Sequence, residues 1–241
     1  CRHLQLDLPS KTLPLPKRGK WHLHASPPCQ KISQANRLVS EKQRDGAIAL
    51  LEWCFEIVET SRPTTWSFEQ VVTPLTIELL ERRRERMPAL YAYAVVNFVD
   101  FGVPQDRRRV IAGSPAVVES FLERKSRHRC VADAIVPTPA RWIMNTTTNT
   151  PDRRGGHRPL RAEEHMRPVT RPAYTVLASG ALKWVESSGA LIRALTPREA
   201  ATLQTFPPTY NLGEGSLASQ RRGVGNAVPV EAARRWMAST R

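Results

Sequence analysis

Three stretches of the sequence carry side chains that could do chemistry. Cys29 follows two prolines, Glu69 ends an apolar run, and Arg107 and Arg109 lie two positions apart in a basic stretch. A cysteine on a stiff loop can act as a nucleophile when its thiolate is favoured. A carboxyl group at the end of an apolar strand is well placed for acid catalysis, and closely spaced arginines can hold a polar heterocycle or phosphates.

Each of these residues alone has a plainer structural explanation. A single cysteine after a strand is more often a small buried hydrophobic side chain. A single glutamate is more often a helix cap or an ion-pair partner, and a run of arginines is usually a solvated surface. Only the order and the setting of the three stretches favour a common site.

The elements around these residues follow a regular order. Residues 21–25 alternate apolar and polar side chains, which predicts a short strand that must end at the following prolines. Residues 42–60 have apolar side chains at helical spacing, residues 64–68 form a second β-rich run, and residues 74–86 begin with proline and end in basic residues, as helices do. The alternation predicts a parallel α/β sheet.

Two further strands are predicted at residues 91–98 and 108–112. The connection around Gly102 is short enough for a hairpin, which would add an antiparallel strand at the edge of the sheet. Ligands bind at the carboxyl ends of strands in such sheets, and all three reactive stretches are predicted to lie at these ends or at the hairpin.

The regular pattern fades between residues 114 and 189. Residues 115–172 contain 11 Lys or Arg and 6 Asp or Glu, a net charge of +5. This composition predicts a loop-rich lobe with a positive surface, with a disordered linker as the alternative. Beyond it, Thr196 is expected to cap a helix, residues 223–227 to form a turn, and Pro229 to open a final helix.

The composition restricts the partners and cofactors. The net charge is +14, from 36 Lys or Arg against 22 Asp or Glu, and favours nucleic acid over a membrane surface. No apolar run approaches the roughly 20 residues that cross a bilayer. The four cysteines form no CxxC pair and have no histidines at zinc spacing, so we expect reduced thiols, an intracellular protein and no metal.

Taken together, the motifs resemble those of the DNA cytosine-5 methyltransferase family. Five segments match in the order that the family shows: Ser26–Ser33, Phe68–Val71, Phe101–Arg109, Arg193–Pro207 and Gly225–Val230. The second segment departs from the family because Gln70 replaces an asparagine, which could loosen support of the cysteine loop.

The resemblance implies a mechanism on a cytosine that has been swung out of the duplex. Cys29 would add to cytosine C6, and Glu69 would hold and protonate ring N3. C5 would then take a methyl group from S-adenosylmethionine. Arg109 would contact the base, and Arg107 would organise the cysteine loop.

The resemblance also implies binding residues. Those assigned to the DNA substrate are Gln30, Ser33, Gln105, Arg153, Arg154 and Arg161. Those assigned to the methyl donor are Pro28, Asn226 and Ala227. For Arg153, Arg154 and Arg161 there is an equal alternative, which is that they are solvated charges on a loop and contact no phosphate.

The implied fold is a partial S-adenosylmethionine-dependent methyltransferase sheet, Rossmann-like, with a smaller target-recognition lobe. Residues 1–113 would form the catalytic α/β domain, residues 114–190 the target-recognition region, and residues 191–241 a return to the catalytic domain. The expected partner is double-stranded DNA, and restriction-modification is an expected setting.

One family motif is missing from the sequence. No Phe-x-Gly-x-Gly loop for the methyl donor occurs, and the first residue is Cys1. We therefore expect a missing N-terminal segment or a partner chain to supply that loop, and we expect residues 1–241 alone to bind the donor weakly. The alternatives are an RNA cytosine-5 methyltransferase, although no Cys-Phe-Thr tripeptide is present, and a non-catalytic DNA-binding remnant.

Overall fold

The computed structural model describes residues 15–16, 19–29, 40–145 and 165–240. The chain divides into two compact units. The first unit comprises residues 1–96, 108–123 and 238–241, and the second unit comprises residues 97–107 and 124–237.

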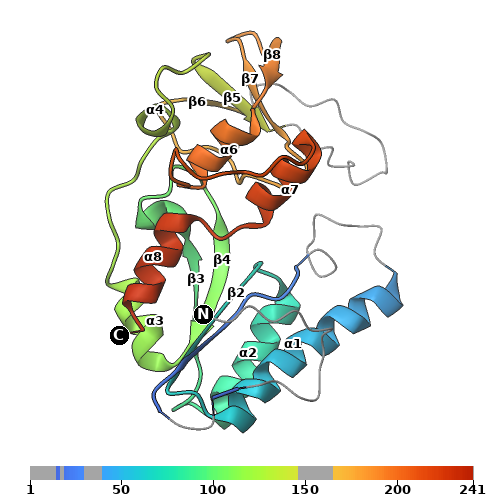
Figure 1. Cartoon of the computed structure of the whole chain (residues 1–241), viewed down its shortest axis with the longest axis vertical. Helices are drawn as coiled ribbons and strands as arrows, with labels where there is room; N and C mark the ends of the chain where they lie inside the picture. The colour runs from blue at the N-terminus through green and yellow to red at the C-terminus, as the bar shows by residue number, and fades with distance from the viewer. Residues whose placement is uncertain (1–14, 17–18, 30–39, 146–164, 241) are drawn as a thin grey trace. The chain divides into compact units, whose positions relative to one another are not determined.

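The first unit is built on a mixed sheet with the strand order β1-β2-β4-β3 (Figure 1). The strands are β1 (His22–Ala25), β2 (Thr65–Gln70), β3 (Ala92–Asn97) and β4 (Arg108–Gly113). β1 pairs in parallel with β2, and β2 pairs antiparallel with β4. The strands and the antiparallel direction of β4 were predicted correctly. The edge position was wrong, because β4 inserts between β2 and β3 and leaves β3 at the edge.

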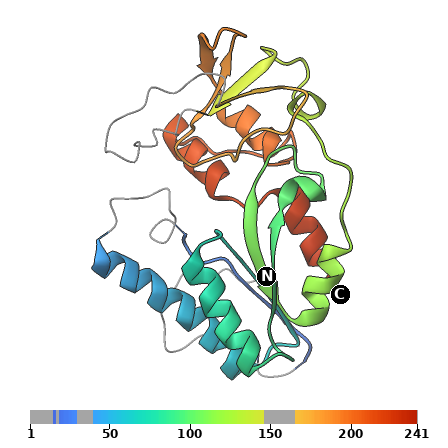
Figure 2. The same cartoon turned by 180° about the vertical axis from the view of Figure 1, so that it is seen from behind.

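Helices cover both faces of this sheet (Figures 1 and 2). The helices α1 (Glu41–Ser61) and α2 (Pro74–Arg86) lie on one face, and α3 (Pro115–Leu122) lies on the other. Ser40 caps α1 through a reciprocal pair of hydrogen bonds with Gln43, and Thr73 caps α2 just before its first-turn proline. These caps confirm the predicted helices and fix where the loops before them end.

An aromatic cluster fills the space between the sheet and the helices α1 and α2. Phe55 of α1 lies 5.0 Å from Phe68 and 6.3 Å from Trp66, measured between ring centroids. Tyr91 packs edge-on against Trp66 at 4.9 Å. All four side chains are at most 2% exposed, and the Trp66 indole also donates a hydrogen bond to the Leu90 carbonyl. The cluster therefore fixes β2, the strand that carries Glu69.

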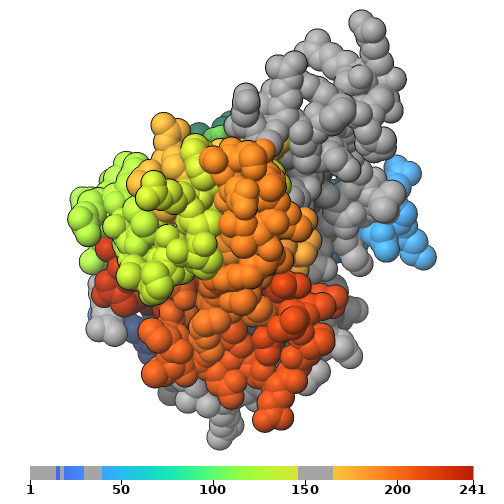
Figure 3. Space-filling model, turned by 90° about the horizontal axis from the view of Figure 1, so that it is seen from above, coloured from blue at the N-terminus to red at the C-terminus, as the bar shows by residue number. Residues whose placement is uncertain are grey.

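The second unit contains a separate antiparallel sheet with the order β6-β5-β7-β8. Its strands are β5 (Trp142–Asn145), β6 (Met166–Pro168), β7 (Leu182–Val185) and β8 (Leu191–Ala194). In the view from above, the segment of β7 and β8 lies beside that of β5 (Figure 3). The sequence predicted a loop-rich lobe here, but it did not predict these individual strands. Strands of three and four residues are too short to show an alternating pattern.

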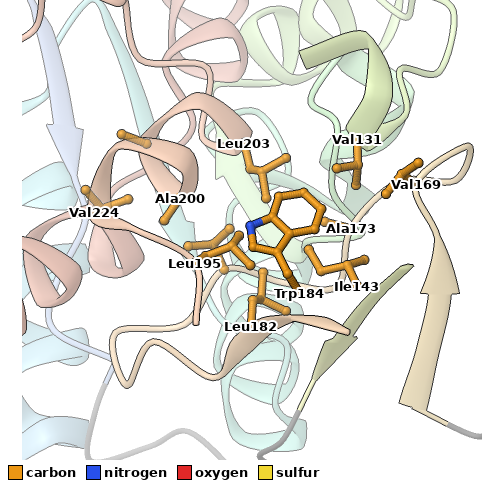
Figure 4. Packing of buried hydrophobic residues seen from close by; sticks show 12 residues of the cluster. Val131, Ile143, Val169, Ala173, Leu182, Trp184, Leu195, Ala200, Leu203 and Val224 are labelled. Atoms are coloured by element: carbon orange, nitrogen blue, oxygen red, sulfur yellow. The ribbon is translucent and has the colours of Figure 1, made fainter. Parts of the chain in front are cut away.

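Trp184 is the centre of the core of the second unit (Figure 4). Its indole is fully buried and is surrounded by Ile143, Leu182, Leu195 and Leu203. Burial of a large aromatic side chain contributes strongly to the stability of such a small sheet. Residues from strands and from the helix after β8 meet in this core, so the sheet and the C-terminal helices form one unit.

The C-terminal part of the second unit has three helices. They are α6 (Pro197–Leu203), α7 (Leu217–Asn226) and α8 (Val230–Ala238). The final helix was predicted correctly. The turn predicted at residues 223–227 was wrong, because most of this glycine-containing stretch is the last turn of α7. A Cβ atom added to Gly225 would lie 2.3 Å from the Ala178 nitrogen, so glycine is needed here for close packing.

The helix α6 begins with the predicted cap, in which Thr196 and Glu199 hydrogen-bond each other. Both guanidinium Nη atoms of Arg193 donate to the Glu199 carboxylate at 2.7 and 2.8 Å, and the Trp184 indole donates to it at 3.1 Å. Burial alone would raise the pKa of Glu199. These hydrogen bonds outweigh that effect and lower the pKa to about 2.

The pH dependence of stability tests this cluster. A carboxyl group with a lowered pKa stabilises the fold above its unfolded pKa of about 4.3, and that contribution is lost as the pH falls towards the folded pKa. We expect Glu199→Gln to lower the free energy of unfolding in urea at pH 7, and the difference from wild type to shrink between about pH 5 and pH 3. Glu186→Gln, at an exposed acid after β7, should change stability little at any of these values. A Glu199→Gln deficit that is the same at pH 7 and pH 3 would contradict the assignment.

Candidate active site

The loop that carries Cys29 begins where β1 ends. Ala25 of β1 lies opposite Phe68 of β2, so the residues just after Ala25 lie beside the end of β2. The Ser26 hydroxyl donates to Glu69 Oε2 at 3.3 Å. The Cys29 thiol is partly buried and forms no disulfide. The sequence-predicted nucleophile and acid thus lie on adjacent segments of one unit.

Gln70 links the end of β2 to this loop. Its amide nitrogen donates to the Pro27 carbonyl at 3.0 Å, and its amide oxygen accepts from the Val71 nitrogen at 2.9 Å. The side chain is 1% exposed. The glutamine in place of the family's asparagine therefore does reach the cysteine loop.

Glu69 is 7% exposed, and one oxygen of its carboxyl group forms no hydrogen bond within the part of the chain that the structure describes. Arg109 Nε lies 2.9 Å from Glu69 Oε1, which is close enough for an ion pair. The two groups are not aligned for a hydrogen bond, and Oε1 is buried without a hydrogen-bond partner among the described residues. A buried carboxyl oxygen without a hydrogen bond can form one with a ligand.

The guanidinium of Arg107 is 3% exposed and bonds to carbonyls of the second unit. Nη1 donates to Val176 at 3.1 Å, and Nη2 donates to Gly225 and to Ala227, each at 3.2 Å. Arg107 therefore fixes the main chain around Asn226, which is exposed at the end of α7. Its predicted role in organising the cysteine loop stays a prediction.

Gln105 is fully buried, which does not fit the expected contact with DNA. Its amide nitrogen donates to the Leu203 carbonyl and to Gln204 Oε1, each at 2.9 Å, and its amide oxygen accepts from the Val176 nitrogen at 2.9 Å. In this structure the side chain holds the main chain of the second unit, and its expected contact with DNA stays a prediction. Gln204 was missed as a polar core residue because its partners are far away in the sequence.

The other predicted residues are placed only in part. Pro28 and Asn226 are exposed, and Ala227 is partly buried. Five of the predicted substrate contacts lie outside the described residues: Gln30, Ser33, Arg153, Arg154 and Arg161.

Two histidines beside the cysteine loop were also missed. The Ser67 hydroxyl lies 2.8 Å from His22 Nε2 and 2.8 Å from His24 Nδ1. Burial lowers the pKa of both rings, and the neighbouring His24 lowers that of His22 further. The Ser67 hydroxyl can donate to one ring nitrogen and accept from an N–H of the other ring, which links β1 to β2.

The described residues contain neither a candidate membrane span nor a candidate metal-binding cluster. No helix in them is long and apolar enough to cross a membrane. Within the same residues, no group of three or more His, Cys, Asp or Glu could hold a metal ion.

Comparison with known families gives one match over most of the chain. The model of the family described as C-5 cytosine-specific DNA methylase matches residues 21–115 and 120–240. This range includes all the residues of the candidate active site that the structure describes.

Two curated relatives of the chain are also named as methyltransferases. The chain is 26% identical over 250 residues to the type II methyltransferase M1.HphI of Haemophilus parahaemolyticus, and 29% identical over 224 residues to the type II methyltransferase M.AplI of Arthrospira platensis. Each match covers 84% of this chain and 63% of the relative, so the chain spans less than two thirds of their length.

Among solved structures, a putative DNA modification methyltransferase encoded within an E. coli prophage matches with a TM-score of 0.58 and 18% identity, over 90% of this chain and 77% of that one. The Dnmt2 methyltransferase of S. pombe matches with a TM-score of 0.55 and 14% identity, over 90% of this chain and 76% of that one. At these identities the matches show the fold, which is the predicted methyltransferase α/β fold.

Removal of the Gln70 amide tests how the cysteine loop is held. We expect Gln70→Leu to lower the free energy of unfolding by about 1–3 kcal/mol, because the Val71 amide and the Pro27 carbonyl lose their partner. Cys29 should also react faster with a thiol reagent. Gln70→Asn, which keeps a shorter amide, should fall between the two proteins. Wild-type stability together with a wild-type alkylation rate in Gln70→Leu would contradict this account.

Proposed function

Because the chain belongs to the C-5 cytosine-specific DNA methylase family, we propose that it methylates C5 of cytosine in double-stranded DNA. The observation that carries the proposal is the buried carboxyl group of Glu69 beside the start of the cysteine loop, whose Oε1 lies 2.9 Å from Arg109 Nε but forms no hydrogen bond among the described residues. Its curated relatives are named type II methyltransferases, which supports modification of DNA as the setting.

The first step proposed is addition of a thiolate to the base. A cytosine within the stack cannot be reached, so it must first be extruded from the duplex. The Cys29 sulfur then forms a bond to C6, and the electron pair of the C5–C6 bond becomes available at C5. The two prolines before Cys29 limit the directions that the thiol can take, which supports this role.

Glu69 supplies the acid for that step. Its carboxyl group would donate a proton to ring N3 as the sulfur adds, which removes negative charge from the ring. Oε1, which forms no hydrogen bond among the described residues, is the position proposed for this contact, and Oε2 accepts a hydrogen bond from Ser26. Arg109, 2.9 Å from Oε1, is near enough to contact the same base.

The methyl group would come from S-adenosylmethionine, which supplies it as an electrophile to C5. An exposed amide such as that of Asn226 fits the polar groups of this molecule, and its backbone is fixed by the buried Arg107. Asn226, Ala227 and Pro28 would hold the donor. S-adenosylhomocysteine would be the product of the donor. Water would then take the C5 proton, N3 would return its proton to Glu69, the C5–C6 double bond would form again, and Cys29 would leave as thiolate.

DNA recognition is proposed for residues 114–190. Their basic composition suits contacts with phosphates, while single side chains would read base edges in the major groove. The residues proposed to contact DNA are Gln30, Ser33, Arg153, Arg154 and Arg161, and residues 1–113 and 191–241 would form the catalytic part.

The test is an assay for 5-methylcytosine by mass spectrometry, with the complete gene product that contains residues 1–241. Duplex DNA should be methylated and transfer RNA should not. Glu69→Gln should lower turnover by about 100-fold with little change in melting temperature or DNA affinity. The control Glu81→Gln, at an exposed partner of Tyr93, should retain activity.

Three results would oppose the proposal. Methylation of transfer RNA alone would favour the RNA enzyme, and absence of methylation with intact DNA binding would favour the non-catalytic alternative. A collapse of stability in Glu69→Gln, with normal activity per folded molecule, would make Glu69 structural.

In the same assay, a chimaera carrying residues 114–190 of a relative should methylate a different DNA sequence, and an unchanged sequence preference would refute the recognition role.

A further inference from the structure

The end of α7 is held by buried polar side chains instead of by solvent. The last carbonyls of a helix have no partner within the helix. Here the carbonyls of Val224, Gly225 and Ala227 accept hydrogen bonds from two side chains, Arg107 and Gln204. The exposed residue Asn226 lies within this stretch.

Gln204 supplies bonds on both sides of Asn226. Its amide nitrogen donates to Val224 at 2.8 Å and to Ala227 at 3.2 Å. The side chain is 0% exposed, so these bonds form in a low-dielectric setting where an unpaired group is costly.

The orientation of the Gln204 amide is set by Gln105. The Gln105 amide nitrogen donates to Gln204 Oε1 at 2.9 Å. An acceptor at that position forces the Gln204 nitrogen towards the end of α7. Because Gln105 is also bonded to Leu203 and Val176, it cannot rotate without breaking other hydrogen bonds.

The same short segment also holds the helix that follows. The Gln204 carbonyl accepts from the Val230 nitrogen at 3.0 Å, and the Thr205 hydroxyl accepts from the Glu231 nitrogen at 2.8 Å. Both nitrogens belong to the first turn of α8, which lacks acceptors of its own. Residues 204–205 therefore hold the main chain before and after Asn226.

We propose that Gln204, aligned by Gln105, is a positioning residue that directs the Asn226 amide towards the methyl donor. The inference rests on the proposed function for the identity of the donor. The link from Gln105 through Gln204 to the main chain around Asn226 rests on the hydrogen bonds described above. Gln204 acts through Asn226 and does not itself touch the donor, since its side chain is fully buried.

The kinetic test is a double-mutant cycle in the complete gene product. Gln204→Met has a similar volume and no hydrogen bonds, and it should raise KM for S-adenosylmethionine by about 5- to 100-fold, as expected for two lost hydrogen bonds. The value of kcat and the DNA affinity should change less than about 3-fold. In an Asn226→Ala background, Gln204→Met should have no further effect on KM.

Two further variants complete the test. Gln220→Met, which removes one bond from a glutamine in α7 to the Gly213 carbonyl, should leave KM unchanged. Gln105→Met should raise KM in the same direction if Gln204→Met does not fold. An equal rise in KM on Gln204→Met in the presence and in the absence of the Asn226 amide would overturn the inference.

Amide hydrogen exchange separates this inference from the proposed function, because it needs no donor and no activity. In Gln204→Met the amides of Ala227 and Val230 should exchange at least about 5-fold faster, while those of β2 stay unchanged. Faster exchange in a protein that methylates nothing would confirm that Gln204 holds the main chain at the end of α7, and it would refute the proposed function. Unchanged exchange would overturn the inference even if the enzyme is active.

Discussion

The candidate active site depends on the parallel pairing of β1 with β2. The register places Ala25 opposite Phe68, and from there Ser26 bonds to Glu69 and Pro27 bonds to Gln70. A shift by one residue would turn every side chain to the other face of the sheet. The acid and the loop of the nucleophile would then no longer lie next to each other. The aromatic cluster on β2 resists such a shift.

The second unit is subject to a different constraint, because its buried polar side chains need hydrogen-bond partners. Gln105, Arg107 and Gln204 are each at most 3% exposed, and each bonds to carbonyl or amide groups far away in the sequence. A network of this kind stabilises a fold only when its members find partners. Its members also specify one arrangement of the main chain at the end of α7, where the proposed function places the exposed Asn226.

The sequence was informative wherever local patterns were long. The helices at Glu41–Ser61 and Pro74–Arg86 have caps and several turns of apolar spacing, and the helix at Thr196 has a complete capping pattern. The short strands β5 and β6 could not be predicted, because they are stable only through pairing with distant segments and a buried Trp184.

The sequence pointed to the residues of the candidate site but not to their hydrogen-bond partners. Cys29 and Glu69 stood out because of their neighbours in the sequence. Gln105 belongs to a motif that suggested a contact with DNA, whereas its partners at Gln204 and Val176 lie 99 and 71 residues away. The glycines of α7 suggested a turn, because their low helix propensity conceals the close packing that Gly225 allows. Long-range partners of this kind leave no local pattern.

The central claim is that Cys29 forms a covalent bond to the target base. The most direct measurement is mass spectrometry of the complete gene product after incubation with S-adenosylmethionine and duplex DNA that contains 5-fluorocytosine, which has no C5 proton to lose. The account predicts one adduct, mapped to the peptide that contains Cys29, and none in Cys29→Ala. Burial raises the pKa of the Cys54 thiol to about 11, which makes it a poor competitor. An adduct at Cys54 or Cys130, or one that survives Cys29→Ala, would contradict the account.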